Sequence, residues 1–279
     1  MVAHLFRITA ATACVILCTL LPFLPGRYDG LAVPVSTMAQ LVGKLGLLLV
    51  PVGGVWVAAE HRRRTGRARY ACALAALIVS SVVWVLVSLV VMTESLTLGT
   101  GTLGLGGYAV TRLVPRLGSL RSAAPGRASA MPAYLTIVPV TVALVQLALA
   151  DPVTEFSRSR AIRNSAPLIA DIEAHRAANG RYPLSSLSVW PDYKPSVIGI
   201  KEYRYEPSGD AYNVMFEQPN FRFGTREIVI YNPRDEQAIA SHALDVLQLT
   251  PEQLALDRTR GHNAVHDAPH PHWKYFRFD

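Results

Sequence analysis

Four stretches of this chain are long and apolar enough to cross a lipid bilayer as helices. A bilayer core of about 30 Å needs roughly 20 apolar residues in helical conformation. The stretches lie at about residues 6–25, 39–59, 71–92 and 131–150. The chain as a whole is 51% hydrophobic and only 17% charged, which is unusually apolar for a soluble protein. The sequence therefore predicts a multi-pass membrane protein.

The excess positive charge lies entirely in the apolar half of the chain. Residues 1–150 contain 12 Lys+Arg and 3 Asp+Glu (net +9), and residues 151–279 contain 15 and 17 (net −2), which together give +7. Arginine and lysine in loops beside membrane spans mark the cytoplasmic side. A nucleic-acid groove needs basic residues gathered on a folded face, and the polar half has no such excess. We therefore expect a transmembrane domain at 1–150, a polar domain at 151–279, and no nucleic-acid partner.

A weaker fifth segment decides on which side of the membrane the polar domain lies. Residues 96–115 are rich in Gly and Thr and uncharged until Arg112. The loop HRRRTGRAR at residues 61–69 contains five arginines, and residues 112–127 contain four and no acid. If the segment crosses, both basic loops lie in the cytoplasm, whereas with four crossings the second would lie outside. We predict about five spans in a bacterial cytoplasmic (inner) membrane, with the C-terminal domain extracytoplasmic.

The apolar half shows no pattern that predicts catalysis. Gly99, Gly101 and Gly104 form a GxGxxG string, which binds dinucleotides only between a strand and a helix. In an apolar stretch, such small residues instead allow helices to pack closely. Lys44 lies about five residues from the outer end of its span, so its ammonium is expected to reach the interface. We expect this half to serve as a membrane anchor, in which Pro51 kinks the second span.

The polar half predicts an α+β domain, with one N-terminal helix packed on a small antiparallel sheet. Asp151-Pro152 is expected to close the last span and to begin this helix. Apolar residues then recur in helical steps of 4, 3 and 3, at Ile162, Ala166, Ile169 and Ile172. Alternating apolar stretches follow at 203–205, 212–216 and 228–230, and the last residues, HWKYFRFD, are expected to add an edge strand. All three cysteines lie in predicted spans, so no disulfide supports this domain.

A helix stop precedes the predicted sheet. Asn179-Gly180 is expected to end the helix with a left-handed residue. Tyr182 is then expected to fold back onto the helix face that carries Ile169 and Ile172, while Pro183 directs the chain away.

The string APLIADIEAHRAANGRYPLSSL, followed by WPDY and YRYEPSGDAYNVMFE, resembles the globular domain of type IV pilins and type II secretion pseudopilins. The resemblance covers about residues 155–232. Those proteins share a helix that ends in a Gly-x-Tyr-Pro turn, a variable loop, and an antiparallel sheet across the helix. This chain departs from them because several spans come first and no FTLIE-like string with a glutamate begins the last one. The resemblance implies a pilin-like domain and a protein partner of the envelope, pilus or secretion type; the alternative is an unrelated small α+β domain.

Histidines gather near the C-terminus, in GHNAVHDAPHPH. They are His262, His266, His270 and His272, half of the eight in the chain. On a helix the first two would share a face, and on a strand the last two would share a side, so the imidazoles would converge on Zn or Cu. Gly261, Pro269 and Pro271 instead predict an irregular, solvated tail.

Two classes of function follow from these observations. The leading one is a non-catalytic integral membrane protein that presents an extracytoplasmic interaction domain to an envelope partner. The alternative is a metal-binding envelope sensor or a metal-dependent enzyme that uses the C-terminal histidines. We assign no catalytic, cofactor-binding or metal-binding residue and expect no cofactor.

Overall fold

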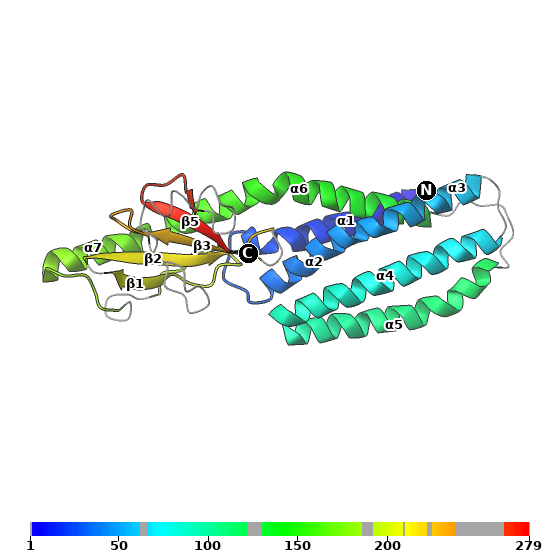
Figure 1. The fold of residues 1–279 in the computed structure, drawn as a ribbon, viewed down its shortest axis with the longest axis horizontal. Helices are drawn as coiled ribbons and strands as arrows, with labels where there is room; N and C mark the ends of the chain where they lie inside the picture. Colours follow the sequence, from blue (N-terminus) through cyan, green and yellow to red (C-terminus); the bar gives the residue numbers. More distant parts are fainter. Residues whose placement is uncertain are drawn as a thin grey trace. The chain divides into compact units, whose positions relative to one another are not determined.

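The computed structural model describes residues 2–61, 66–121, 130–185, 192–208, 210–221, 225–237 and 265–278 of the 279-residue chain. The chain forms two compact units (Figure 1). One unit comprises Met1–Leu20 and Leu31–Leu149, and the other comprises Leu21–Gly30 and Ala150–Asp279. We call them the bundle and the sheet domain. The assignment of the short segment Leu21–Gly30 to the sheet domain was not predicted.

The bundle consists of helices that are apolar over most of their length. They are α1 (Val2–Leu20), α2 (Ala32–Gly46), α3 (Val50–His61), α4 (Gly66–Glu94), α5 (Leu96–Arg121) and the first part of α6 (Met131–Asn164). Four helical segments have the length and composition of membrane spans: Ala3–Phe23, Ala32–His61, Gly66–Glu94 and Met131–Asn179. The predicted apolar stretches fall within these four segments, except that the first extends two residues further. The structure thus supports a multi-pass membrane protein.

Proline explains why the second span is made of two helices. The short 3-10 turn η2 (Leu47–Leu49) separates α2 from α3. Pro51 follows it, and a proline inside a helix lacks the N–H that would bond to the carbonyl four residues earlier, here that of Leu47. The α-helical pattern is therefore interrupted just before the proline, where the sequence predicted a kink.

Helices α4 and α5 form an antiparallel hairpin in which only Ser95 separates them (Figure 1). Across the pair, Trp84 Nε1 donates a hydrogen bond to the carbonyl oxygen of Thr102 at 2.6 Å. A β-carbon at Gly99 would lie 2.3 Å from the Met92 side chain, and one at Gly106 would lie 2.0 Å from Trp84. Gly99 and Gly106 therefore allow the close approach, whereas no atom lies within 4 Å of a β-carbon at Gly101 or Gly104, the other two glycines of the GxGxxG string. The string lies inside a helix rather than in a strand-to-helix loop.

Helix α6 packs against α1 and α2 through a buried polar group. The Gln146 amide donates to Thr19 Oγ1 and to the Ala39 carbonyl, each at 3.4 Å. Gly43 leaves room for it, because a β-carbon there would lie 2.9 Å from Gln146 Nε2. Interhelical hydrogen bonds and small residues are the usual means of helix association in lipid.

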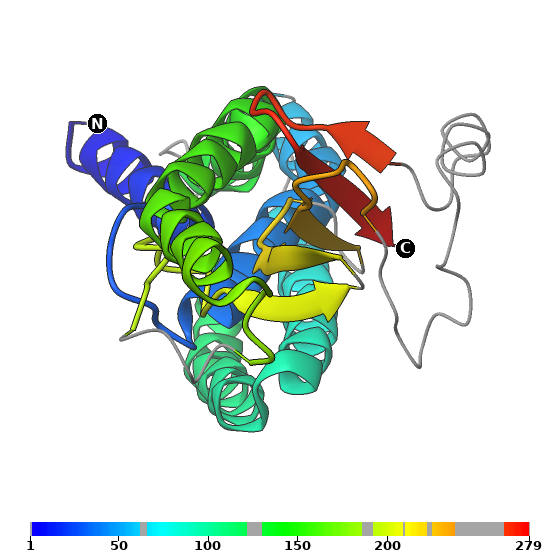
Figure 2. The ribbon, with the colours of Figure 1, turned by 90° about the vertical axis from the view of Figure 1, so that its left-hand side faces the viewer.

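In the sheet domain, α6 continues to Asn164 and α7 covers Ala166–Asn179. Five strands follow: β1 (Arg204–Ser208), β2 (Ala211–Gln218), β3 (Arg226–Tyr231), β4 (Val265–Asp267) and β5 (Trp273–Phe278). They form one antiparallel sheet in the order β1-β2-β3-β5-β4. The end of α6 and α7 pack on one face of it (Figures 1 and 2). The predicted antiparallel sheet after a helical segment is present, but two helices rather than one pack on it.

Two predictions about this domain were wrong. Pro152 does not start a new helix, because α6 runs through it without interruption; the break comes at Ser165, just before Pro167. The C-terminal strand is not at the edge, because β5 pairs with β3 on one side and with β4 on the other. Burial of Trp273 and Phe276 favours this inner position. Strand β4, at the edge, is formed by part of the histidine-rich stretch that was expected to be irregular.

The segment Leu21–Gly30 adds to the sheet domain through backbone hydrogen bonds. Ile198 N–H donates to the Leu24 carbonyl at 3.0 Å, and Gly199 N–H donates to the Pro22 carbonyl at 2.8 Å. The Phe23 ring stacks on Phe221 with centroids 4.8 Å apart. The loop between α1 and α2 is therefore an integral part of this domain.

Helix α7 ends as predicted. Gly180 has φ 71°, in the left-handed region, and its N–H donates to the Arg176 carbonyl at 2.8 Å. Tyr182 packs on the core that contains Ile172 and Ile169, but it is only half-buried. Its ring meets the edge of Tyr212 with centroids 4.8 Å apart. The tyrosine thus contacts the sheet as well as the helix.

The glycine stop leads to a first prediction. Gly180→Val should lower the stability of the sheet domain by roughly 1–2 kcal/mol, and Gly180→Asn should lower it less, because asparagine tolerates the left-handed conformation. No atom lies within 4 Å of a β-carbon at this position, so the difference reports backbone strain alone. Thermal melts of the full chain would measure it. Val and Asn variants of equal stability would contradict the assignment of this stop.

Candidate functional site

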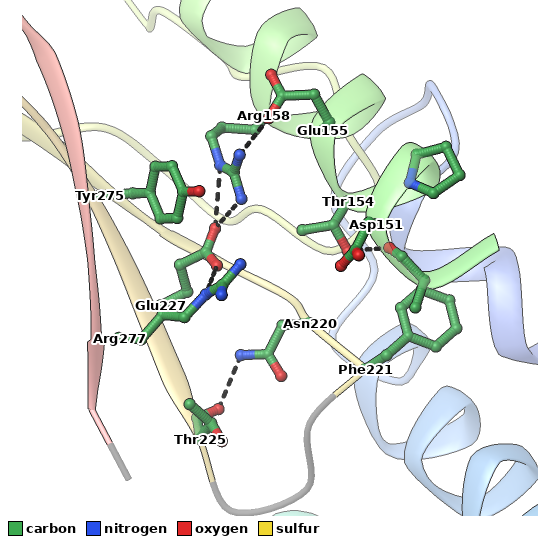
Figure 3. Close-up of a pocket in the computed structure, with 12 residues that line it drawn as sticks. Asp151, Thr154, Glu155, Arg158, Asn220, Phe221, Thr225, Glu227, Tyr275 and Arg277 are labelled. Carbon is green, nitrogen blue, oxygen red and sulfur yellow. Dashed lines mark hydrogen bonds and ion pairs between the residues drawn. The ribbon is translucent and has the colours of Figure 1, made fainter. Parts of the chain in front are cut away.

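The sheet domain contains a hollow of about 520 Å³ between the beginning of its helical part and the sheet (Figure 3). Side chains from α6, β3, β5 and the connection after β2 surround it. Its charged lining residues are Asp151, Glu155, Arg158, Glu227 and Arg277. We call it the α6–sheet pocket. Of these residues only Asp151 had been singled out in the sequence, as the end of the last span.

A buried ion network forms the wall of this pocket. Arg158 is 3% exposed and Glu227 is fully buried. Arg158 Nη2 and Nε donate to Glu227 Oε1 at 2.6 and 3.0 Å, and Nη1 contacts Glu155. Arg277 Nε donates to the other oxygen of Glu227 at 3.2 Å. Burying these charges is tolerable only because each has an opposite charge beside it.

Local geometry explains how these groups meet. Glu155 and Arg158 are three residues apart on α6 and therefore lie on one face of the helix. Glu227 on β3 is the direct cross-strand partner of Arg277 on β5, so their side chains lie on the same face of the sheet. The Arg158 guanidinium also lies over the Tyr275 ring, 3.8 Å from its centroid. The sequence signal for this network was an acidic residue, Glu227, within the mostly apolar strand REIVIY.

Two groups that line the pocket have no hydrogen-bond partner among the described residues. One is the exposed Asp151 carboxylate, and the other is the pair of terminal nitrogens of Arg277, whose Nε donates to Glu227 and whose guanidinium carbon lies 5.3 Å from the centroid of the Tyr275 ring. Arg277 is 24% exposed, so solvent reaches it. The pocket therefore offers one free acceptor and one free pair of donors, while the network behind them neutralises its own charges.

The C-terminal histidines do not converge in the described part of the chain. His266 lies in β4, not on a helix, and stacks on Tyr275 with centroids 4.8 Å apart. His270 and His272 lie in the turn before β5, where they contact Ser159 at 3.3 Å and Asp235 at 3.0 Å respectively. His262 lies outside the described residues. Among those described, no group of three or more His, Cys, Asp or Glu is placed to hold a metal ion.

Tyrosines connect α7 to the sheet. Tyr212 is buried, and its hydroxyl donates to Glu173 Oε1 at 2.9 Å. Tyr205 donates to the Pro183 carbonyl at 2.7 Å, and burial raises the pKa of Tyr205 to about 12. Burial, followed by the Glu173 hydrogen bond, raises the pKa of Tyr212 as well. Neutral phenols held in this way act as structural hydrogen-bond donors rather than as bases.

Comparison of the chain with protein-family models, with curated proteins and with solved structures finds no match. The resemblance to pilins therefore depends on the quoted residues and on the local geometry.

Proposed function

We propose that the protein is a non-catalytic membrane protein whose bundle crosses a bacterial cytoplasmic membrane five times and holds the sheet domain on the extracytoplasmic side for an envelope partner. The observation that carries this proposal is a cluster at one end of the bundle. Trp56 near the end of α3, Cys72 near the start of α4, Leu117 near the end of α5 and Leu135 near the start of α6 pack together. Helix ends that meet in this way support a crossing by α5 along with the others.

A second cluster marks the opposite end. Val91 near the end of α4 packs with Leu98 near the start of α5 and with Met38 of α2. Thr37 donates to Glu94 at this end, at 3.0 Å. Since α4 and α5 run between the two clusters in opposite directions, the start of α4 and the end of α5 lie at one end of the bundle. The sequence is rich in arginine at both places, at 61–69 and at 112–121, which supports the assignment of this end to the cytoplasm.

The composition of α5 is compatible with a crossing. Its 26 residues are about 39 Å long at a helical rise of 1.5 Å per residue, which exceeds the bilayer core. The hydroxyl of Thr100 donates to the Leu96 carbonyl at 2.8 Å, and that of Thr111 donates to the Tyr108 carbonyl at 2.8 Å. Hydroxyls satisfied by their own helix do not need water. Helix α5 does not qualify as one of the four apolar segments, because its glycines and threonines lower its mean hydropathy.

The role of the sheet domain follows from its position after the fifth crossing. The glycine stop of α7, the Tyr182-Pro183 turn and the antiparallel sheet across the helix support a pilin-like domain and an envelope partner of the pilus or secretion type. The paired charges of the α6–sheet pocket support a structural rather than a catalytic role for them.

Reporter fusions test this topology. Alkaline phosphatase fused after Gly30 or after Asp151 should be active, because both positions lie outside, and the same enzyme fused after Arg121 should be inactive. Fluorescent-protein fusions at the same three positions serve as the matched control and should show the opposite pattern. Activity after Arg121 together with inactivity after Asp151 would establish four crossings and overturn the proposal.

A further inference from the structure

The α6–sheet pocket lies where the chain leaves the apolar segments, at two independent places. Asp151 follows Leu149, the last bundle residue, by two positions, and both belong to the uninterrupted helix α6. Phe221, which also lines the pocket, stacks on Phe23, which follows the last residue of α1 by three positions. Each connection is only a few residues long. The pocket is therefore within reach of the headgroup layer that borders the hydrocarbon core.

The free groups of the pocket carry opposite charges. The terminal nitrogens of Arg277 offer two parallel N–H donors, which suit the oxygens of a phosphate. The Asp151 carboxylate accepts hydrogen bonds from an ammonium group. With Asp151 included, the charged lining residues sum to −1, since they comprise two guanidiniums and three carboxylates. A ligand that carries an ammonium group for Asp151 and a phosphate for the N–H donors of Arg277 would match both groups.

We propose that the α6–sheet pocket binds the headgroup of a zwitterionic phospholipid with a primary ammonium, of the phosphatidylethanolamine type. The phosphodiester accepts hydrogen bonds from Arg277, and the ammonium donates to Asp151. The volume of about 520 Å³ is in the range of small-molecule sites, and the acyl chains would return to the bilayer. This proposal goes beyond the function proposed above, because presentation of the sheet domain requires only the bundle.

Lipid titration of the purified full chain tests the proposal. The detergent-solubilised, delipidated protein would be titrated with phosphatidylethanolamine, with phosphatidylglycerol and with soluble glycerophosphoethanolamine, and bound lipid counted by native mass spectrometry. We expect phosphatidylethanolamine to bind about tenfold more tightly than phosphatidylglycerol, the equivalent of about 1.4 kcal/mol. Glycerophosphoethanolamine should bind more weakly than the lipid, because it lacks the acyl chains held by the micelle.

Two variants and a control distinguish the loss of a lipid-binding group from a loss of folding stability. Asp151→Asn should abolish the preference for phosphatidylethanolamine with an unchanged melting temperature, because this residue is exposed. Glu202→Gln, at an exposed carboxylate outside the pocket, is the matched control and should keep the preference. Arg277→Lys retains the charge but loses the paired donors, and it should weaken binding of both lipids alike.

The outcomes that would overturn the proposal are distinct. Equal affinity of the unaltered protein for the two lipids would exclude recognition of the ammonium. A preference that survives Asp151→Asn would place the site elsewhere. Equal affinity for glycerophosphoethanolamine and for the lipid would identify a soluble zwitterion, rather than the membrane, as the source of the ligand. None of these results depends on the side of the membrane on which the domain lies.

Discussion

Glu227→Ala should destabilise the sheet domain by about 3–5 kcal/mol, the cost of leaving buried charge without its partner. Glu227 is fully buried and shared by Arg158 and Arg277, so its removal leaves two guanidiniums facing each other across the space it occupied. Arg158 is only 3% exposed, and Glu155 would be its only remaining carboxylate partner. Domains are typically stable by only 5–15 kcal/mol, so this loss would be a large part of the total.

Thermal melts of the full chain, followed by near-ultraviolet circular dichroism and by protease resistance of the sheet domain, would measure this effect. Glu206→Ala is the matched control, because Glu206 is an exposed glutamate on β1, and it should change stability by less than about 0.5 kcal/mol. Glu227→Gln should be intermediate, since the amide fills the space and still accepts one hydrogen bond. If the Glu227→Ala variant has the same melting temperature as the unaltered protein, Glu227 is not the buried centre of the network.

Trp273→Ala should lower the stability of the sheet domain by about 3–5 kcal/mol. The mechanism differs from that of Glu227→Ala, because loss of the indole creates a cavity. Trp273 begins β5, is 5% exposed and packs on Tyr231 and Phe216, with ring centroids 5.4 and 5.9 Å away. Because β5 lies between β3 and β4, loss of this side chain weakens the sheet at an inner strand. An edge strand, the position expected from the sequence, would suffer much less.

Lys274→Ala provides the comparison for the tryptophan variant. Lys274 is the next residue of the same strand, faces the opposite side of the sheet, and is only half-buried, so its truncation should have little effect. The same melts would measure both variants. Equal, small losses for the two would mean that the C-terminal strand adds little to the core, in contradiction to the inner position of β5.

The histidine-rich stretch shows the limit of sequence patterns. Its prolines and glycine predicted an irregular tail, yet Val265–Asp267 forms β4 and pairs with β5. A three-residue strand has almost no pattern of its own, since its stability comes from the hydrogen bonds and side chains of its neighbour. The alternative metal site likewise assumed a helix and a strand that would align the imidazoles. The observed strand and turn direct His266, His270 and His272 to three separate partners.

The amino-acid sequence by itself determined the features whose free energy is local. Runs of about 20 apolar residues favour a helix in lipid wherever they occur, and Gly180 ends a helix because glycine has no β-carbon to strain. Only the tertiary structure decided which distant residues meet. Glu227 and Arg158 are 69 positions apart, and their pairing depends on the sheet register and the rotation of α6. The α6–sheet pocket and the addition of Leu21–Gly30 to the sheet domain arise in the same way, from packing of segments that carry no signal of one another.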